Sequence, residues 1–259
     1  MKKRTRQRVT RVALYVLFLA IITVVAFVTD WGRVQNGFFN WDAAKDMFPS
    51  VLTIAAKNTI IYTIAAFALG LVGGLVIALM KLSSVAPYRW AATLYVEIFR
   101  GLPALLTIFL FAFGIPIALG VRIPFDGGPI LGLSVVAAAY MAETIRAGIE
   151  AVPRGQVEAA RSLGMSQGRA MVSVVIPQAL RIVIPPMTNE LILLIKDTSL
   201  LFIAGQTPAS KELLAFGRDI ATDVFNSTPL IVVGVVYLII TIPLTRLVAL
   251  LERRNRQAR

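Results

Sequence analysis

Four groups of charged or polar residues interrupt long apolar stretches of this 259-residue chain. Charged side chains are costly in apolar surroundings, so each group is a candidate either for a binding pathway or for an internal ion pair. The groups are Glu97 with Arg100, Glu143 with Arg146, Asn189 with Glu190, and the run Lys196, Asp197, Thr198 and Ser199. They offer hydrogen-bond donors and acceptors of both charge signs, which suits the binding of a small polar molecule.

The spacing within two of these groups allows ion pairs. Glu97 and Arg100, like Glu143 and Arg146, are three residues apart and can meet on one face of a helix. We favour a structural ion pair for Glu143 and Arg146, whereas for Glu97 and Arg100 the structural and binding roles are equally supported.

The run 196–199 favours a polar cavity. Adjacent residues on a helix point about 100° apart, so Lys196 and Asp197 cannot share one narrow face. Two hydroxyl side chains follow them directly.

Composition excludes most enzyme classes. The chain contains no cysteine and no histidine, which removes thiolate nucleophiles, histidine bases and the usual zinc ligands. It carries no G-x-x-x-x-G-K-[ST] phosphate-binding loop, so it has no site of that kind for ATP. The formal net charge of +12 could indicate nucleic-acid binding, but the basic residues lie mostly between apolar runs and at the chain ends. We expect no nucleic-acid partner and no metal.

The elements that must position these groups are membrane-spanning helices. The chain is 57% hydrophobic and only 15% charged, which is typical of a polytopic membrane protein. A helix needs about 20 apolar residues to cross a bilayer. The sequence therefore predicts an all-α protein with about six spans, at residues 12–29, 52–80, 91–119, 129–149, 182–205 and 229–250.

Lysine and arginine set the expected orientation. They are concentrated in 1–11, 81–90, 146–181 and 246–259, which places these segments and both termini in the cytoplasm. The basic start followed by an apolar run also fits a signal peptide. Because no small-residue cleavage site follows, we favour an uncleaved anchor. Gly70 and Gly74 in the second span predict close helix packing, more readily within the chain than between subunits.

One polar segment, residues 146–181, interrupts the apolar spans. Residues 156–163 contain good helix formers, and Gly164 suits a left-handed residue after a helix end. Ser166 suits the N-cap of a second short helix reaching about residue 173. We expect Pro177 to limit that helix and the pair at 185–186 to break the chain again. The apolar residues Val157, Ala160, Leu163 and Met165 suit a shallow groove on another protein. An amphipathic connector on the lipid headgroups is the alternative.

This segment resembles the signature loop of ATP-binding-cassette (ABC) importer permeases. The pattern is E-A-A, three residues, glycine, nine residues, then I-x-L-P. It matches Glu158, Ala159 and Ala160, then Gly164, then 174–177 ending in Pro177, with valine and isoleucine as mild departures. "YVEIFRGLP", "AYMAETIRAGI" and "IPPMTNELILLIKDTSL" resemble the polar amino acid uptake branch. The likeness covers about residues 51–250.

The resemblance implies a type I importer permease, located in the bacterial cytoplasmic membrane. It would pair with a second permease subunit, identical or homologous, and with a cytoplasmic ATPase dimer that holds ATP and magnesium; this chain would bind no cofactor. An extracytoplasmic binding protein would deliver the substrate. The helix containing Glu158 to Gly164 would occupy a groove of the ATPase, with Leu163 and Pro177 in the same coupling loop, 150–177.

The resemblance also divides the chain and suggests a substrate. Residues 1–50 form a basic tail, an extra span and an outer loop; 51–250 form the permease unit; 251–259 form a basic tail. A glutamate, glutamine, aspartate or basic amino acid is expected as cargo. Its carboxylate would find donors at Lys196, Thr198 and Ser199, and its ammonium acceptors at Asp197 or Glu97. Residues 205–227 contain a predicted short outer helix where the binding protein docks, unless it is an ordinary connection.

A self-contained secondary transporter or channel is the main alternative function. It would share the spans and the buried charges, but it would have no use for the segment from Glu158 to Gly164. A membrane-bound enzyme is a weaker alternative, because no nucleophile motif is present.

Overall fold

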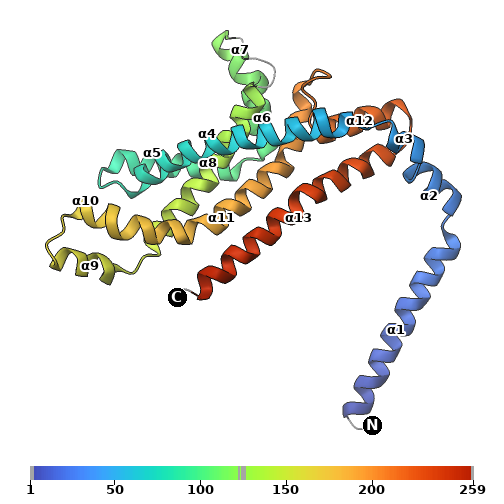
Figure 1. The fold of residues 1–259 in the computed structure, drawn as a ribbon, viewed down its shortest axis with the longest axis horizontal. Coiled ribbons are helices and arrows are strands. Elements are labelled where there is room, and N and C mark those ends of the chain that lie inside the picture. Colours follow the sequence, from blue (N-terminus) through green and yellow to red (C-terminus); the bar gives the residue numbers. More distant parts are fainter. Residues whose placement is uncertain (1–2, 122, 124–126, 258–259) are drawn as a thin grey trace.

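The chain forms an elongated bundle of helices (Figure 1). The computed structural model describes residues 3–121, 123 and 127–257, and no β-strand occurs among them. The predicted all-α class is therefore confirmed. Five helical stretches are long and apolar enough to cross a membrane, and a bent pair of helices makes a sixth when counted as one span.

The α-helices in chain order are α1 (Lys3–Val28), α2 (Trp31–Phe38), α3 (Trp41–Lys45), α4 (Lys57–Leu82), α5 (Ala86–Gly101), α6 (Ala104–Phe109), α7 (Ile115–Leu119), α8 (Gly127–Glu150), α9 (Arg154–Ser162), α10 (Gln167–Ala170), α11 (Ile176–Asp197), α12 (Leu213–Asp223) and α13 (Thr228–Gln257). Three π-helical segments are η1 (Val51–Ala56), η2 (Leu110–Gly114) and η3 (Met171–Val175), and a 3-10 segment is η4 (Thr198–Ala204). We refer to the two ends of the bundle as the α9 end and the α12 end.

Helix α8 forms the centre of the bundle and packs most extensively against α4. Small residues allow this approach. A Cβ added at Gly70 would lie 2.9 Å from the Cβ of Ala137, and one at Gly74 would lie 2.9 Å from the Cβ of Met141. The two glycines therefore serve packing within the chain, as the sequence predicted.

We predict that Gly74→Val lowers the free energy of unfolding by about 1–3 kcal/mol, because the added side chain overfills the contact between α4 and α8. Thermal unfolding in detergent, followed by circular dichroism, measures the change. Gly234→Val is the matched control, since a Cβ at Gly234 in α13 meets nothing within 4 Å. Equal stability of the two variants would show that this contact is not tight.

Four of the predicted spans appear close to their expected positions: the helical stretches Thr10–Val28, Val51–Leu82, Gly127–Glu150 and Thr228–Leu250. The third predicted span, 91–119, corresponds to a bent pair of helices, Ala86–Gly101 and Ala104–Leu119. Helices α5 and α6–α7 are bent by 107° at the intervening break. Leu102 has an extended backbone, because proline at 103 disfavours the helical conformation of the residue before it.

The fifth predicted span, 182–205, is too short, and the expected breaks do not occur. Helical structure is continuous from Gln167 to Ala204. Pro177 lies in the first turn of α11, directly after η3, where a missing N–H is tolerated. Pro185 and Pro186 lie inside α11. Helices that cross membranes tolerate interior prolines, because neighbouring groups satisfy the freed carbonyls.

Helix α1 stands apart from the bundle, and none of its apolar window is buried (Figure 1). The segment after it is attached to the α12 end. The backbone N–H of Ser227 donates to Gly37 O at 2.9 Å, and that of Asn40 donates to Thr228 Oγ1 at 2.9 Å. Met47 is fully buried in a second core formed with η1, α12 and α13. Part of the predicted N-terminal unit, 1–50, thus packs on helices of the predicted unit 51–250.

Candidate functional site

The segment around Gly164 forms a compact helix-turn-helix at one end of the bundle (Figure 1). Helix α9 ends at Ser162, and Gly164 adopts φ +87°, a left-handed conformation that residues with a Cβ rarely take. Its N–H donates to Arg161 O at 2.9 Å. Ser166 then caps α10 by accepting from the N–H of Arg169. The predicted turn and cap are both present.

The residues of this segment divide between an inner and an outer side. Ala160 is buried, and Val157 packs on a small core that contains Val175 and Ala179. Val157 and Ala160 therefore lie on the inner side of α9, and the exposed residues of the segment are the ones available to another protein. Leu163 is 83% exposed. Glu158, Ala159, Gly164 and Pro177 are exposed as well.

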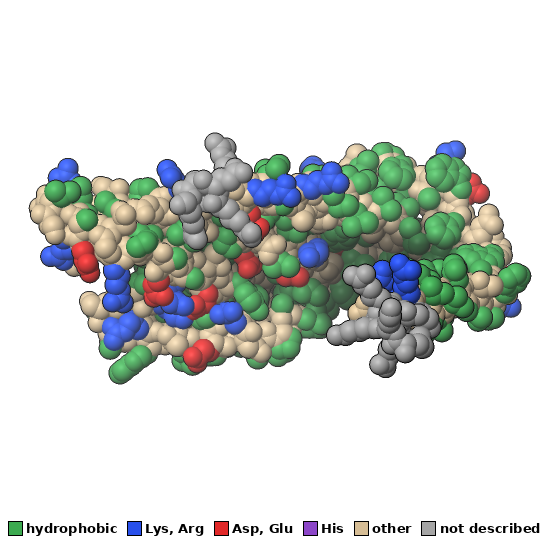
Figure 2. All heavy atoms as spheres, turned by 90° about the horizontal axis from the view of Figure 1, so that it is seen from below, with side chains coloured by type: hydrophobic (Ala, Val, Ile, Leu, Met, Phe, Trp, Pro, Cys, Tyr) green, Lys and Arg blue, Asp and Glu red, His purple; other side chains and the backbone are tan. Residues whose placement is uncertain are grey.

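An ion-pair network connects α8 with the end of α4. Arg146 Nη2 lies 2.8 Å from Glu143 Oε2, the proximity that the spacing predicts. Lys81, 62 residues earlier in the chain, forms an ion pair with the other oxygen of Glu143. Arg146 Nη1 reaches Glu150 Oε2 at 2.5 Å. On the face shown in Figure 2, most charged side chains lie in the half that carries α9.

Glu97 and Arg100 are both exposed, and they form no ion pair with each other in the part of the chain that the structure describes. The guanidinium of Arg100 instead lies over the ring of Tyr140, 5.2 Å from its centroid. This cation–π contact joins α5 to α8.

The polar residues of α11 form two stripes, because positions seven apart share a helix face. Asn189 and Lys196 are exposed on one stripe, while Glu190 and Asp197 are half-buried on the next. Glu190 lies within electrostatic range of both Asp197 and Arg100.

The two hydroxyl residues that follow Asp197 are less accessible. Thr198 is fully buried, and its Oγ1 donates to Ile195 O at 2.7 Å. Ser199 is half-buried.

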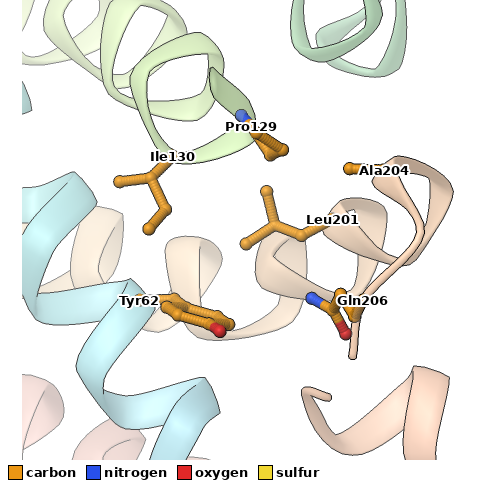
Figure 3. Close-up of a pocket in the computed structure, with 6 residues that line it drawn as sticks. All are labelled: Tyr62, Pro129, Ile130, Leu201, Ala204 and Gln206. Atoms are coloured by element: carbon orange, nitrogen blue, oxygen red, sulfur yellow. The ribbon is translucent and has the colours of Figure 1, made fainter. Parts of the chain in front are cut away.

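A shallow pocket opens beside this region (Figure 3). Its lining is mainly apolar and comes from α4, α8, η4 and the loop that follows η4. The residues are Tyr62, Pro129, Ile130, Leu201, Ala204 and Gln206. None of the predicted pathway residues lines it, so we do not assign it to the substrate.

The sequence prediction missed a buried carboxyl at the α12 end. Glu212 is fully buried at the start of α12. Burial raises the pKa of Glu212 to about 7, although the amides of Ala215 and Leu214 and the hydroxyl of Tyr237 favour its charged form. No pattern in the sequence distinguishes this glutamate from a surface residue, because the elements that bury it lie far apart in the chain.

Asp219, on the same helix, behaves in the opposite way. Partial burial acts to raise its pKa, but hydrogen bonds from Lys211 and Arg218 outweigh burial and lower the pKa. Lys211 Nζ lies 2.7 Å from Asp219 Oδ2, and Arg218 Nη2 lies 2.8 Å from Oδ1. The predicted helix in 205–227 is present as α12.

Comparison with known families decides among the functional alternatives. Residues 70–257 match the family described as "Binding-protein-dependent transport system inner membrane component". The chain belongs to this family. The matched range includes α8, the turn at Gly164 and α11.

Individual relatives of this permease are amino acid transporters. It is 38% identical over 200 residues to the probable glutamine ABC transporter permease protein GlnM of Bacillus subtilis (strain 168), covering 76% of this chain and 89% of that protein. It is 34% identical over 215 residues to the arginine transport system permease protein ArtQ of the same strain, covering 83% and 96%. It is 31% identical over 224 residues to the glutamate/aspartate import permease protein GltK of Escherichia coli O157:H7, covering 84% and 98%.

Solved structures support the same family. A crystal structure of an amino acid ABC transporter with histidines matches with a TM-score of 0.75 and 34% identity, over 83% of this permease and 98% of that chain. An inward-facing MetNI methionine ABC transporter shares the fold, with a TM-score of 0.64 at 22% identity, over 78% and 93%. The resemblance to amino acid ABC importer permeases is therefore confirmed.

Proposed function

We propose that this permease forms the translocation pathway of an ATP-driven importer for a polar amino acid. The observation that carries the proposal is the exposed helix α9 with its left-handed turn at Gly164, placed at one end of a helical bundle that can span a membrane. Relatives named for glutamine, arginine and glutamate/aspartate support a polar amino acid as cargo.

Helix α9 couples ATP hydrolysis by a partner protein to movement of the permease. The permease carries no phosphate-binding loop of its own, so a cytoplasmic ATPase dimer binds and hydrolyses ATP with magnesium. Closure of this dimer displaces α9. Leu163 provides the apolar contact and Glu158 a polar one, while Ala159 lies beside them on the exposed side. Gly164 sets the direction of the turn. The packing of Val157 on Val175 of η3 and Ala179 of α11 transmits the displacement into the bundle.

Substrate passes along the polar stripes of α11. Asn189 and Lys196 are exposed in the single chain, which suits a wall of a pathway completed by a second permease subunit. Asp197 and Glu190 supply acceptors for an ammonium group, and Lys196 supplies a donor for a carboxylate. Arg100 contributes charge from α5.

The remaining partners follow from this assignment. The permease lies in the bacterial cytoplasmic membrane. Its α9 end and both termini face the cytoplasm, and its α12 end faces an extracytoplasmic binding protein. The permease unit spans residues 51–250, and the permease itself binds no cofactor and performs no chemistry.

Purification from bacterial membranes tests the proposed function. A tagged permease is expected to copurify with an ABC ATPase in a mild detergent. ATP hydrolysis by this complex in nanodiscs is then expected to rise when the matching binding protein is added with glutamine, glutamate, aspartate or arginine. Failure of all amino acids to stimulate hydrolysis, or absence of an ATPase from the purified sample, contradicts the proposal. A secondary transporter would purify without an ATPase.

A further inference from the structure

Glu212 is a buried carboxyl that holds the first turn of α12. Its Oε1 accepts from the N–H of Ala215 and its Oε2 from that of Leu214, each at 2.6 Å. The N–H of Glu212 donates to Gln206 Oε1 at 2.9 Å. Among the described residues no lysine or arginine forms an ion pair with Glu212. The position of the Glu212 side chain therefore depends on its hydrogen bonds and not on a cation.

Tyr237 extends this cap into the rest of the bundle. Its hydroxyl donates to Glu212 Oε2 at 3.2 Å, and the side chains of Thr198 and Thr59 lie near the same hydroxyl. Thr59 Oγ1 accepts from the N–H of Leu213 at 3.1 Å. Both threonines are fully buried. One phenol group on α13 thus meets α4, η4 and α12 at a single point.

Such a cluster fixes the relative positions of its elements. A hydroxyl has one hydrogen to donate and two lone pairs, and a buried polar group that loses its partner is costly. A shift of α12 relative to α13 would separate Glu212 from Tyr237, and a shift relative to α4 would separate the N–H of Leu213 from Thr59. Satisfied buried polar clusters therefore favour one arrangement of the surrounding elements.

The cluster meets the predicted pathway at its buried edge. Thr198 is the first residue of η4 and follows Asp197 directly. Helix α12 presents Arg218, Thr222 and Asp223 to solvent, while Gly217 on its other face lies against Val233 of α13. An added Cβ at Gly217 would lie 2.5 Å from Val233 Cγ2, so α12 and α13 are tightly packed. A displacement of α12, caused by binding at its exposed face, would therefore be felt at residues 196–199.

We propose that Glu212 and Tyr237 are positioning residues that fix the outer helix α12 to the pathway segment 196–199, so that a change on α12 alters the pathway. The proposal rests on the proposed function for the meaning of the pathway, but the physical link between α12 and η4 is independent of it. Neither residue touches substrate in this account.

Tyr237→Phe tests the link, because it removes one hydroxyl and keeps the ring. In the permease–ATPase complex, we expect the maximal binding-protein-stimulated ATPase rate to fall by about fivefold or more, the effect of losing one buried hydrogen bond. The half-saturating concentration of binding protein should stay unchanged, because the exposed face of α12 is intact. In nanodiscs, hydrogen exchange should become faster at the amides of 198–204 and of Leu214 and Ala215.

Tyr95→Phe is the matched control. Its hydroxyl donates to Val135 O at 2.8 Å and joins α5 to α8, away from α12. This variant should keep the stimulated rate and the exchange of 198–204. Glu212→Gln replaces one acceptor with a donor that faces a backbone N–H, so it should also speed exchange at Leu214 and Ala215. The double variant should lose no more stimulation than Glu212→Gln alone, since both changes break one link.

Three outcomes overturn the proposal. The first is a Tyr237→Phe permease with wild-type stimulation and wild-type exchange. The second is a raised half-saturating concentration with an unchanged maximal rate, which would make the cluster a support for docking only. The third is an additive loss in the double variant. If the wild-type complex shows no stimulation, the proposed function fails, and the exchange measurement still decides whether Tyr237 links α12 to η4.

Discussion

Replacing Leu163 by aspartate is expected to abolish ATP-driven uptake and to remove the ATPase from the purified complex. Leu163 is 83% exposed directly after α9 ends, whereas Val157 and Ala160 are occupied by contacts within the chain. The role of filling an apolar groove on the ATPase therefore falls to Leu163. A charge placed in such a groove loses its water without gaining a partner. We expect affinity for the ATPase to fall at least about 100-fold, as for loss of an interface hot spot.

Gln167→Asp is the control for this variant. Gln167 is exposed in the same segment and begins α10, so the substitution adds the same charge where a helix start tolerates it. Gly164→Asp provides a second test through the backbone, since φ +87° strains residues with a Cβ while the space around Gly164 is open. Both Leu163→Asp and Gly164→Asp should insert into the membrane normally. Full uptake by Leu163→Asp would show that α9 is not the ATPase contact.

Asp197→Asn is expected to reduce substrate-stimulated ATP hydrolysis without loss of assembly. Asp197 is half-buried on α11, one position before the buried Thr198, and Glu190 shares its helix face. An asparagine keeps the size of the side chain but removes the charge that attracts an ammonium group. A charge-assisted hydrogen bond is about twice as strong as a neutral one, so we expect the half-saturating substrate concentration to rise about tenfold.

Glu150→Gln is the matched control for the loss of one carboxylate charge. Glu150 is exposed at the end of α8 and pairs with Arg146, on a different helix from Asp197. Size-exclusion chromatography of each complex reports assembly separately from activity. A disrupted Asp197→Asn complex would make Asp197 a structural residue, and unchanged substrate dependence in an intact complex would remove it from the pathway.

The sequence was sufficient for four of the spans, because bilayer thickness ties hydropathy directly to helix length. It failed where local preferences compete with tertiary contacts. Leu102 and the proline after it end α5 as the local rule demands, yet the long apolar run concealed a bend of 107°. Pro185 and Pro186 do not end their helix: they remain inside α11 despite the poor helix propensity of proline. Local propensity alone does not separate these two cases.

In the candidate site, too, local features could be predicted from the sequence and contacts between distant residues could not. The turn at Gly164 and the cap at Ser166 are local, so the spacing in the sequence predicted them. Lys81 and Glu143, 62 residues apart, meet only because α4 packs against α8. Leu213 and Thr59 are 154 residues apart in the chain. Contacts of this kind depend on the fold, and a single sequence carries no local pattern for them.

Uptake of labelled amino acid into sealed vesicles distinguishes an ATP-driven importer from a self-contained transporter. Vesicles are prepared with the permease alone, and in parallel with the permease, its ATPase and its binding protein. We expect uptake only in the complete system with ATP, and no uptake by the permease alone under a proton or sodium gradient. Gradient-driven uptake by the permease without any ATPase would contradict the importer function and support a self-contained transporter.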